Sequence, residues 1–168
     1  AASSPTAAIS SASTGCTGTP ITLTDASTGG PSSWLWTMPG GAPATSTVQN
    51  TSVTYSTAGV KTITLTVANG SGTTTATKSI TITASPTVAA SITNTTICSG
   101  ISIVENVTGA TTYTWLPSGS GSTSTLTPTS TTVYTITGST SGCSSAPRTV
   151  TINVTSTPTI NLTASSTT

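Results

Sequence analysis

The chain has 168 residues, a formal net charge of +1 and only 3% charged side chains, and it contains no histidine. So few charges exclude the basic surface that nucleic-acid binding requires. They also provide no basic patch that would bind an anionic membrane surface. No run of about 18 apolar residues is present, so no membrane insertion is predicted. The first residues lack the basic and apolar regions of a signal peptide, which indicates a mature or excised segment.

The few ionisable residues also argue against catalysis. Acid–base chemistry needs a positioned proton carrier, but the two carboxylates, Asp25 and Glu105, lie in different halves of the chain. A serine or threonine nucleophile has no base, and no Cys/His/Asp cluster offers metal ligands. We expect Asp25 to cap its own turn and Glu105 to be a solvated charge at a strand end. The prediction is therefore that the chain is no enzyme and binds no cofactor or metal.

Alternating apolar and hydroxyl residues predict β-strands along the first half of the chain. Residues 1–13 are weakly patterned and would form a linker or an edge strand. Strands are then expected near residues 21–24, 34–38, 62–67 and 75–83. Asn69-Gly70 is a strong hairpin signal between the last two. This first unit would end at residue 85, before Pro86.

A second unit of similar layout is predicted over residues 86–157. The segment from Cys98 to Ile103 corresponds to the segment from Cys16 to Leu23, and Tyr113–Trp115 corresponds to Trp34–Trp36. Such a correspondence at a fixed spacing is typical of tandem domains. Residues 158–168 echo the start of this unit. They would form an extra strand or linker, the start of a next repeat, or an inter-subunit strand that uses Ile160 and Leu162.

Several spaced features carry a resemblance to known families. The sequence Trp34-Leu-Trp-Thr-Met-Pro-Gly-Gly, the Tyr55–Gly59 corner and the strand Lys61–Val67 resemble the central part of a PKD domain, an immunoglobulin-like β-sandwich. This form is similar to PKD repeats of secreted and surface proteins of the Bacteroidota. The second half, with its Gly142-Cys143 pair, resembles Ig-like repeats found beside PKD modules in adhesins of that phylum. The resemblance implies an all-β fold of two tandem Ig-like sandwiches.

The aromatic residues have two interpretations. In Ig-type sandwiches the strand tryptophan anchors the core and a tyrosine near a strand start bonds the corner. We therefore expect Trp36, Tyr55, Trp115 and Tyr134 to be core anchors. The alternative is an exposed platform on which sugars stack. Trp34 stays open, because it shares a face with Trp36 in a sandwich of limited size.

The three cysteines are predicted to differ. Cys98 and Cys143 precede the first and last core strands of the second unit, so an intra-domain disulfide between them is expected, against two buried free thiols. Closing the loop between these two cysteines would stabilise the folded unit by about 4 kcal/mol in the chain-entropy treatment. A disulfide implies an oxidising, extracellular compartment. Cys16 would be a buried free thiol, or a covalent link to a neighbouring chain or repeat.

Glycosylation would keep a nearly uncharged surface soluble. Acceptor patterns for N-linked sugar occur six times, although such matches arise by chance in a sequence this rich in serine and threonine. The candidate acceptors are Asn50, Asn69, Asn94, Asn106, Asn153 and Asn161, together with surface threonine and serine residues.

The preferred functional hypothesis is an extracellular structural or adhesive repeat protein of a bacterial surface. It would associate end to end into a filament, with copies of itself, neighbouring repeats and glycans as partners. The alternative is a non-catalytic polysaccharide-binding or spacer module of a secreted hydrolase. That alternative predicts at least one exposed aromatic platform.

Overall fold

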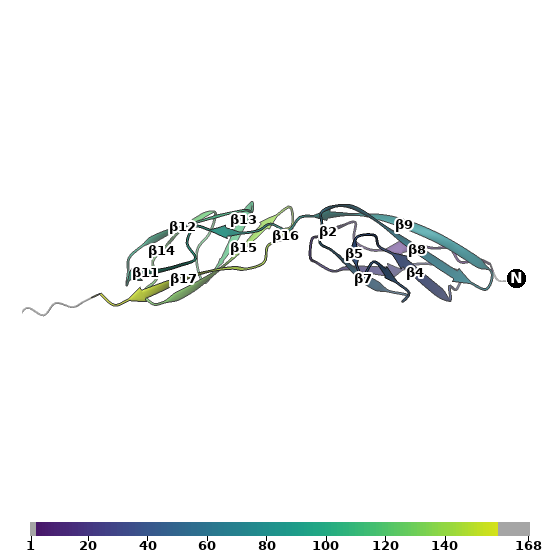
Figure 1. Ribbon diagram of the computed structural model, residues 1–168, viewed down its shortest axis with the longest axis horizontal. Helices are drawn as coiled ribbons and strands as arrows, with labels where there is room; N and C mark the ends of the chain where they lie inside the picture. The colour runs from purple at the N-terminus through teal and green to yellow at the C-terminus, as the bar shows by residue number, and fades with distance from the viewer. Residues whose placement is uncertain (1–2, 158–168) are drawn as a thin grey trace, which may run out of the picture. The chain divides into compact units, whose positions relative to one another are not determined.

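The computed structural model describes residues 3–157, all of whose regular secondary structure is β-strand (Figure 1). Within this range no helix is long and apolar enough to cross a membrane. The chain divides into two compact units, unit 1 (Ala1–Ser85) and unit 2 (Pro86–Thr168). The predicted all-β fold of immunoglobulin-like sandwiches is confirmed. The proposed extra strand with Ile160 and Leu162 lies outside the described residues.

Unit 1 consists of two sheets. Its strands are β1 (Ile9–Ser10), β2 (Thr14–Cys16), β3 (Ile21–Asp25), β4 (Ser33–Thr37), β5 (Gly41–Ala42), β6 (Thr45–Ser46), β7 (Thr51–Tyr55), β8 (Gly59–Asn69) and β9 (Gly72–Thr83). One sheet has the order β1-β3-β7-β5 and the other β2-β9-β8-β4-β6. Within residues 3–13, the short β1 is an edge strand that pairs with β3.

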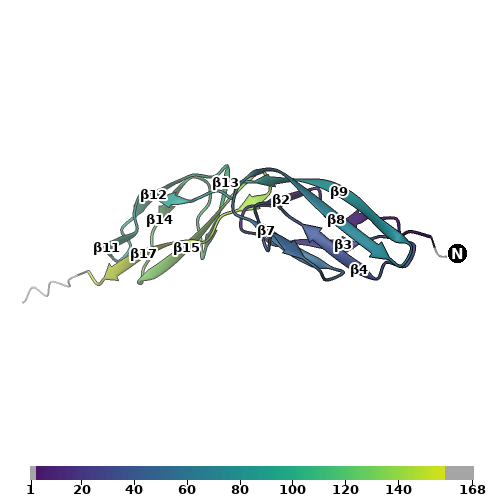
Figure 2. The same cartoon turned by 45° about the vertical axis from the view of Figure 1, so that its right-hand side comes forward.

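The hairpin of β8 and β9 forms the centre of the larger sheet in unit 1, and Figure 2 shows the two strands beside β4. The two strands pair along their whole length, from Gly59↔Ile82 to Asn69↔Gly72. Because side chains alternate between the faces of a strand, Ile63, Leu65 and Val67 of β8 are buried, and the threonines between them lie on the opposite face. The core lies between the sheets and contains Ile21, Leu23, Trp36, Met38, Val53, Tyr55, Ile63, Leu65, Val67, Ile80 and Ile82.

Unit 2 repeats this plan, and its two longest strands are shorter than those of unit 1. Its strands are β10 (Ala89–Ala90), β11 (Asn94–Cys98), β12 (Ile103–Thr108), β13 (Thr112–Leu116), β14 (Thr123–Leu126), β15 (Thr132–Thr140), β16 (Cys143–Ser144) and β17 (Arg148–Thr155). The sheets have the orders β10-β12-β14 and β11-β17-β15-β13, and β16 pairs with β15. Their facing sides bury Val88, Val107, Trp115, Leu126, Tyr134, Ile136, Val150 and Ile152.

Both units close their larger sheet with a parallel pair of strands. In unit 1, β2 pairs with the end of β9, and in unit 2, β11 pairs with β17. All other strand pairs are antiparallel among the described residues. The short strand of each parallel pair leads through a tight turn into the opposite sheet, so each unit has the same construction at this end.

Candidate functional site

The aromatic side chains point inward. All six lie among the described residues: Trp36, Tyr55, Trp115 and Tyr134 are buried, and Trp34 and Tyr113 are half-buried against the two cores. The hydroxyl of Tyr113 donates to the carbonyl of Ala110 and accepts from its amide, both at 2.9 Å. No aromatic ring is therefore left exposed as a sugar-stacking platform.

Asp25 joins three parts of unit 1. Its Oδ1 accepts a hydrogen bond from the Ser27 amide at 2.9 Å, which caps the turn. Its Oδ2 accepts from Trp34 Nε1 at 2.7 Å and from Gln49 Nε2 at 3.2 Å. Burial by itself would raise the pKa of Asp25, but the hydrogen bonds from Ser27, Trp34 and Gln49 outweigh it and hold the pKa below its usual 3.8. The carboxylate is thus fully used as a structural acceptor.

The expectation that Glu105 is a solvated strand-end charge is wrong. Its side chain is only 1% exposed, because position 105 of β12 lies on the inward face with Val107. Oε1 accepts from Ser91 Oγ at 2.9 Å and from the Ile92 amide at 3.0 Å. Oε2 is buried and has no hydrogen-bond partner among the described residues. Glu105 therefore fastens the segment before β11 to β12.

The predicted pairing of Cys98 with Cys143 is also wrong. Cys98 is an exposed free thiol. Cys143 is disulfide-bonded, and so is Cys16, which was expected to be a free thiol or a link to a neighbouring chain or repeat. Disulfide pairing requires Cα atoms within roughly 7 Å, which the spacing of residues along the chain cannot reveal.

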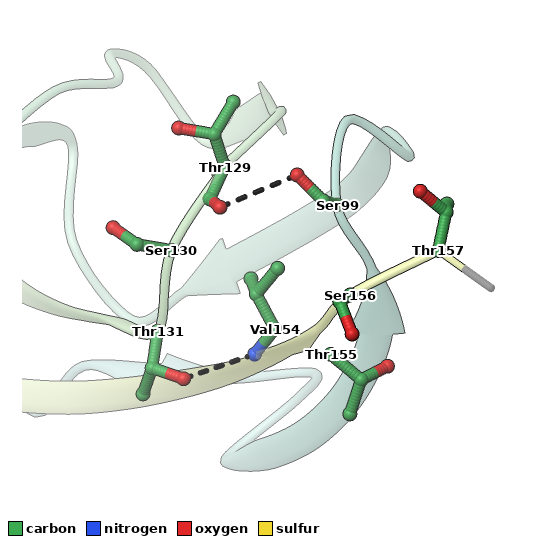
Figure 3. A pocket seen from close by; sticks show the side chains of 8 residues that line it. All are labelled: Ser99, Thr129, Ser130, Thr131, Val154, Thr155, Ser156 and Thr157. Atoms are coloured by element: carbon green, nitrogen blue, oxygen red, sulfur yellow. Dashed lines mark hydrogen bonds between the residues drawn. The ribbon is translucent and has the colours of Figure 1, made fainter. Parts of the chain in front are cut away.

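A hydroxyl-lined groove lies beside the end of β17 in unit 2 (Figure 3). Its volume is about 420 Å³, and its lining consists of Ser99, Thr129, Ser130, Thr131, Val154, Thr155, Ser156 and Thr157. Two hydrogen bonds brace it: Ser99 Oγ donates to the Thr129 carbonyl at 3.3 Å, and the Val154 amide donates to Thr131 Oγ1 at 3.0 Å. The groove has neither a charged nor an aromatic residue, so it offers a ligand hydroxyl groups, backbone groups and the side chain of Val154.

The candidate glycosylation sites separate into two kinds. Asn50, Asn94 and Asn106 are exposed. Asn69 and Asn153 are half-buried, and each uses its Nδ2 to donate hydrogen bonds: Asn69 to the carbonyls of Ser3 and Gly29, and Asn153 to Asn94 Oδ1 and the Thr95 carbonyl. Asn161 lies outside the described residues. Within residues 3–157, no group of three or more His, Cys, Asp or Glu residues could hold a metal ion.

Comparison with solved structures concerns the fold. The chain is 13% identical to a carbohydrate-binding module of a β-sandwich superfamily (TM-score 0.47, 82% of this chain covered), of which it spans 56%. It is 17% identical to titin domains Z1Z2 in complex with telethonin, with 94% of this chain and 100% of that one covered and a TM-score of 0.41. For three N-terminal domains of the outer capsid protein Hoc of bacteriophage RB49, the identity is 16%, the coverage 89% and 59%, and the TM-score 0.38.

Comparison with curated proteins gave no match. The family comparison did, and it concerns the part of the chain that forms unit 1. The Trp34–Gly41 segment, the Tyr55–Gly59 corner and the long β8 strand all lie inside the matched range. Residues 2–84 match the family model of the PKD domain.

Proposed function

We propose that this chain is a non-catalytic structural or adhesive repeat segment of an extracellular protein, and that it associates with copies of itself or with neighbouring repeats. The observation that carries the proposal is the surface: the strands turn most of their large apolar residues inward and threonine and serine outward, with almost no charge. The two carboxylates support a non-catalytic role, because Asp25 and Glu105 are both engaged in structural hydrogen bonds.

The outward face of the β8–β9 hairpin illustrates this surface. Thr64 pairs with Thr77 and Thr66 pairs with Thr75 across the two strands. Cross-strand threonine pairs suit a sheet, yet they carry no charge that would repel a second copy. A nearly neutral surface favours association.

The sheet edges of unit 2 are open to pairing. β13 and β14 are the last strands of their sheets, and among residues 3–157 β13 has only a single bridge, Thr114↔Ser120, outside its ladder with β15. Soluble proteins commonly protect such edges with lysine or proline within the strand, but β13 reads Thr-Tyr-Thr-Trp-Leu. Leu116, at its end, is 62% exposed. Strand addition at this edge would join copies into a filament through main-chain hydrogen bonds.

Two observations support an extracellular location. Cys16 and Cys143 are disulfide-bonded, and disulfides persist in oxidising compartments. The PKD match of unit 1 agrees, because PKD domains are typically extracellular. We propose that the cell surface in question is bacterial and that unit 2 is an Ig-like repeat of the kind found beside PKD modules in Bacteroidota adhesins.

The test of self-association is a concentration series in analytical ultracentrifugation, followed by electron microscopy of the concentrated protein. We expect oligomers and regular fibres at high concentration. Thr114→Lys places a charge on the exposed edge strand β13 and should weaken assembly strongly. Thr62→Lys adds the same charge to the central strand β8, whose main chain is already paired on both sides, and should weaken assembly less. A protein that stays monomeric at every concentration contradicts the proposal.

Glycosylation is part of the same proposal. The exposed acceptors Asn50, Asn94 and Asn106 are the sites that sugar could occupy without breaking the Nδ2 hydrogen bonds of Asn69 and Asn153. Mass spectrometry of the protein from its source should show added mass on peptides with these three residues or on exposed serine and threonine. An intact mass equal to the bare 16.3 kDa would remove this part of the proposal.

A second candidate function is polysaccharide binding within a secreted hydrolase. The hydroxyl-lined groove of unit 2 favours it, whereas the inward position of all six aromatic rings weighs against it. Titration calorimetry against soluble polysaccharides distinguishes the two. Saturable binding by monomers supports the second candidate, and fibres without binding support the first.

A further inference from the structure

The two units end in the same construction. In unit 1, Cys16 is the last residue of β2 and pairs in parallel with Thr83 of β9; in unit 2, Cys98 is the last residue of β11 and pairs in parallel with Thr155 of β17. We call this part of each unit, with the turn that follows the cysteine and the residues after the last long strand, its exit end.

Hydrogen bonds show that the two exit ends match residue by residue. The amide of Thr17 donates to the Thr83 carbonyl at 2.9 Å, and the amide of Ser99 donates to the Thr155 carbonyl at 3.0 Å. Each cysteine carbonyl accepts from the third residue after it, at 3.2 Å in unit 1 and 3.1 Å in unit 2. Gly18 and Gly100 both take a positive φ, 76° and 80°, in the same turn. Cys98 is therefore the structural equivalent of Cys16.

The two exit ends differ in their hydrogen bonds and in the state of their cysteine. In unit 1 the second residue after the last strand is held in place, because the Ser85 amide donates to Thr17 Oγ1 at 2.9 Å and Ser85 Oγ donates to the Thr17 carbonyl at 3.0 Å. In unit 2 the equivalent hydroxyl, that of Ser99, bonds to the Thr129 carbonyl, and the open groove of about 420 Å³ lies beside it. Cys16 is disulfide-bonded, whereas Cys98 is free and exposed.

We propose that the exit end of unit 2 is a covalent docking surface for a further β-sandwich unit of the same kind, and that Cys98 forms a disulfide with it. The inference rests on the proposed repeat function and names the residue that joins the repeats. Of the three cysteines, Cys16 and Cys143 are disulfide-bonded and Cys98 is free. Since Cys98 is the equivalent of Cys16, its partner in the further unit is a cysteine placed like Cys143. Cys143 follows a two-residue turn in which Ser141 and Gly142 both have positive φ, 51° and 80°, as a tight hairpin requires.

The bond would form by thiol–disulfide exchange with a small disulfide such as oxidised glutathione. The Cys98 thiolate attacks one sulfur of that disulfide and displaces a glutathione thiolate. The partner's thiolate then attacks Cys98 Sγ and displaces the second glutathione thiolate. The two protein thiols lose two protons and two electrons in total, and the glutathione disulfide is reduced to two thiols.

The test is an extended form of the whole chain. Residues 97–157 are repeated after Thr168, since residues 158–168 echo residues 86–96, and the added copy carries Cys98→Ser. The oxidised, folded protein is treated with iodoacetamide without reduction, and its labels are counted by intact mass. We expect no label, because Cys98 is then bonded to the added copy of Cys143. A matched control with Cys143→Ser in the added copy should carry a single label on Cys98.

Two labels on the extended chain, one on each of these cysteines, would overturn the proposal. If calorimetry shows no additional unfolding transition, the added unit has not folded, and the decisive measurement moves to the protein from its source. There, Cys98 linked to a cysteine peptide of another β-sandwich unit supports the proposal. A Cys98 that takes up iodoacetamide directly, or that carries only glutathione, overturns it.

The same materials separate this inference from the proposed function. The Cys98→Ser chain should still associate through its sheet edges in ultracentrifugation. Association together with an unprotected Cys98 leaves the proposed function standing and removes the covalent junction. If Cys98 is protected but the protein never associates, the covalent junction stands and the proposed self-association is removed.

Discussion

Replacing Asp25 tests the claim that this carboxylate organises unit 1. Asp25→Ala removes the acceptor of three hydrogen bonds, from the amide of Ser27 at 2.9 Å, Trp34 Nε1 at 2.7 Å and Gln49 Nε2 at 3.2 Å. The half-buried Trp34 indole and Ser27 amide lose their acceptor at a combined cost of about 1–2 kcal/mol, while the exposed Gln49 turns to water and adds little. We expect a loss of about 1–2 kcal/mol, or roughly 4–16 °C in the melting temperature of unit 1.

The pH dependence of this contribution has a definite sign. The pKa of Asp25 is lowered in the folded protein, so the folded state favours the ionised form. Its stabilisation is fully present above the usual value of 3.8 and is lost as the pH falls through the folded pKa. The difference in unfolding free energy between the parent chain and Asp25→Asn should therefore be constant near neutral pH and shrink below 3.8.

Two measurements check this prediction. Urea unfolding at a series of pH values gives the stability difference, with Thr24→Ala, the exposed neighbour on β3, as a control expected to change stability by less than about 0.5 kcal/mol. In a ¹H–¹⁵N spectrum, the Trp34 indole resonance should titrate with Asp25, with its midpoint below 3.8. A midpoint at or above 3.8, or an Asp25→Ala chain as stable as its parent, refutes the reasoning.

Three further predictions concern glycine, tyrosine and cysteine. Gly109→Ala should destabilise unit 2 by about 2–4 kcal/mol in urea unfolding, because the residue has a φ of 99° and an added Cβ would overlap a backbone carbonyl. Gly100→Ala, with a φ of 80° but open space, should cost about 1 kcal/mol. Equal losses of stability in the two variants would contradict this prediction. Tyr113→Phe should lower the unfolding free energy by about 1 kcal/mol, because the Tyr113 hydroxyl makes two hydrogen bonds. Tyr55→Phe should be neutral or stabilising, because the buried Tyr55 hydroxyl has no partner among the described residues. The reverse order of stabilities would contradict this prediction. Alkylation of the folded, unreduced 168-residue chain, expressed without any further unit, should label Cys98 and neither of the other two cysteines, as peptide mapping would show.

The Glu105 error shows how far an alternating pattern can be followed. Position 105 lies two residues from Ile103 and two from Val107, so the period of the strand already placed it on the inward face. The expectation of a solvated charge followed residue type, because glutamate is rarely buried unless it is paired. Burial is tolerated here because Ser91 and Ile92 donate hydrogen bonds to it, and those donors come from a separate segment of the chain.

The sequence by itself determined the β-class of the chain and the inward face of its main strands, since a period of two requires only neighbouring residues, as in Ile63, Leu65 and Val67. Only the tertiary structure decided which cysteines are bonded, that Asp25 meets Trp34 and Gln49, and that Cys98 repeats the position of Cys16. Each of these depends on distances between segments far apart in the chain, which local periodicity does not encode. The alternation along a strand specifies which face a side chain lies on, but tertiary packing specifies which residues it contacts.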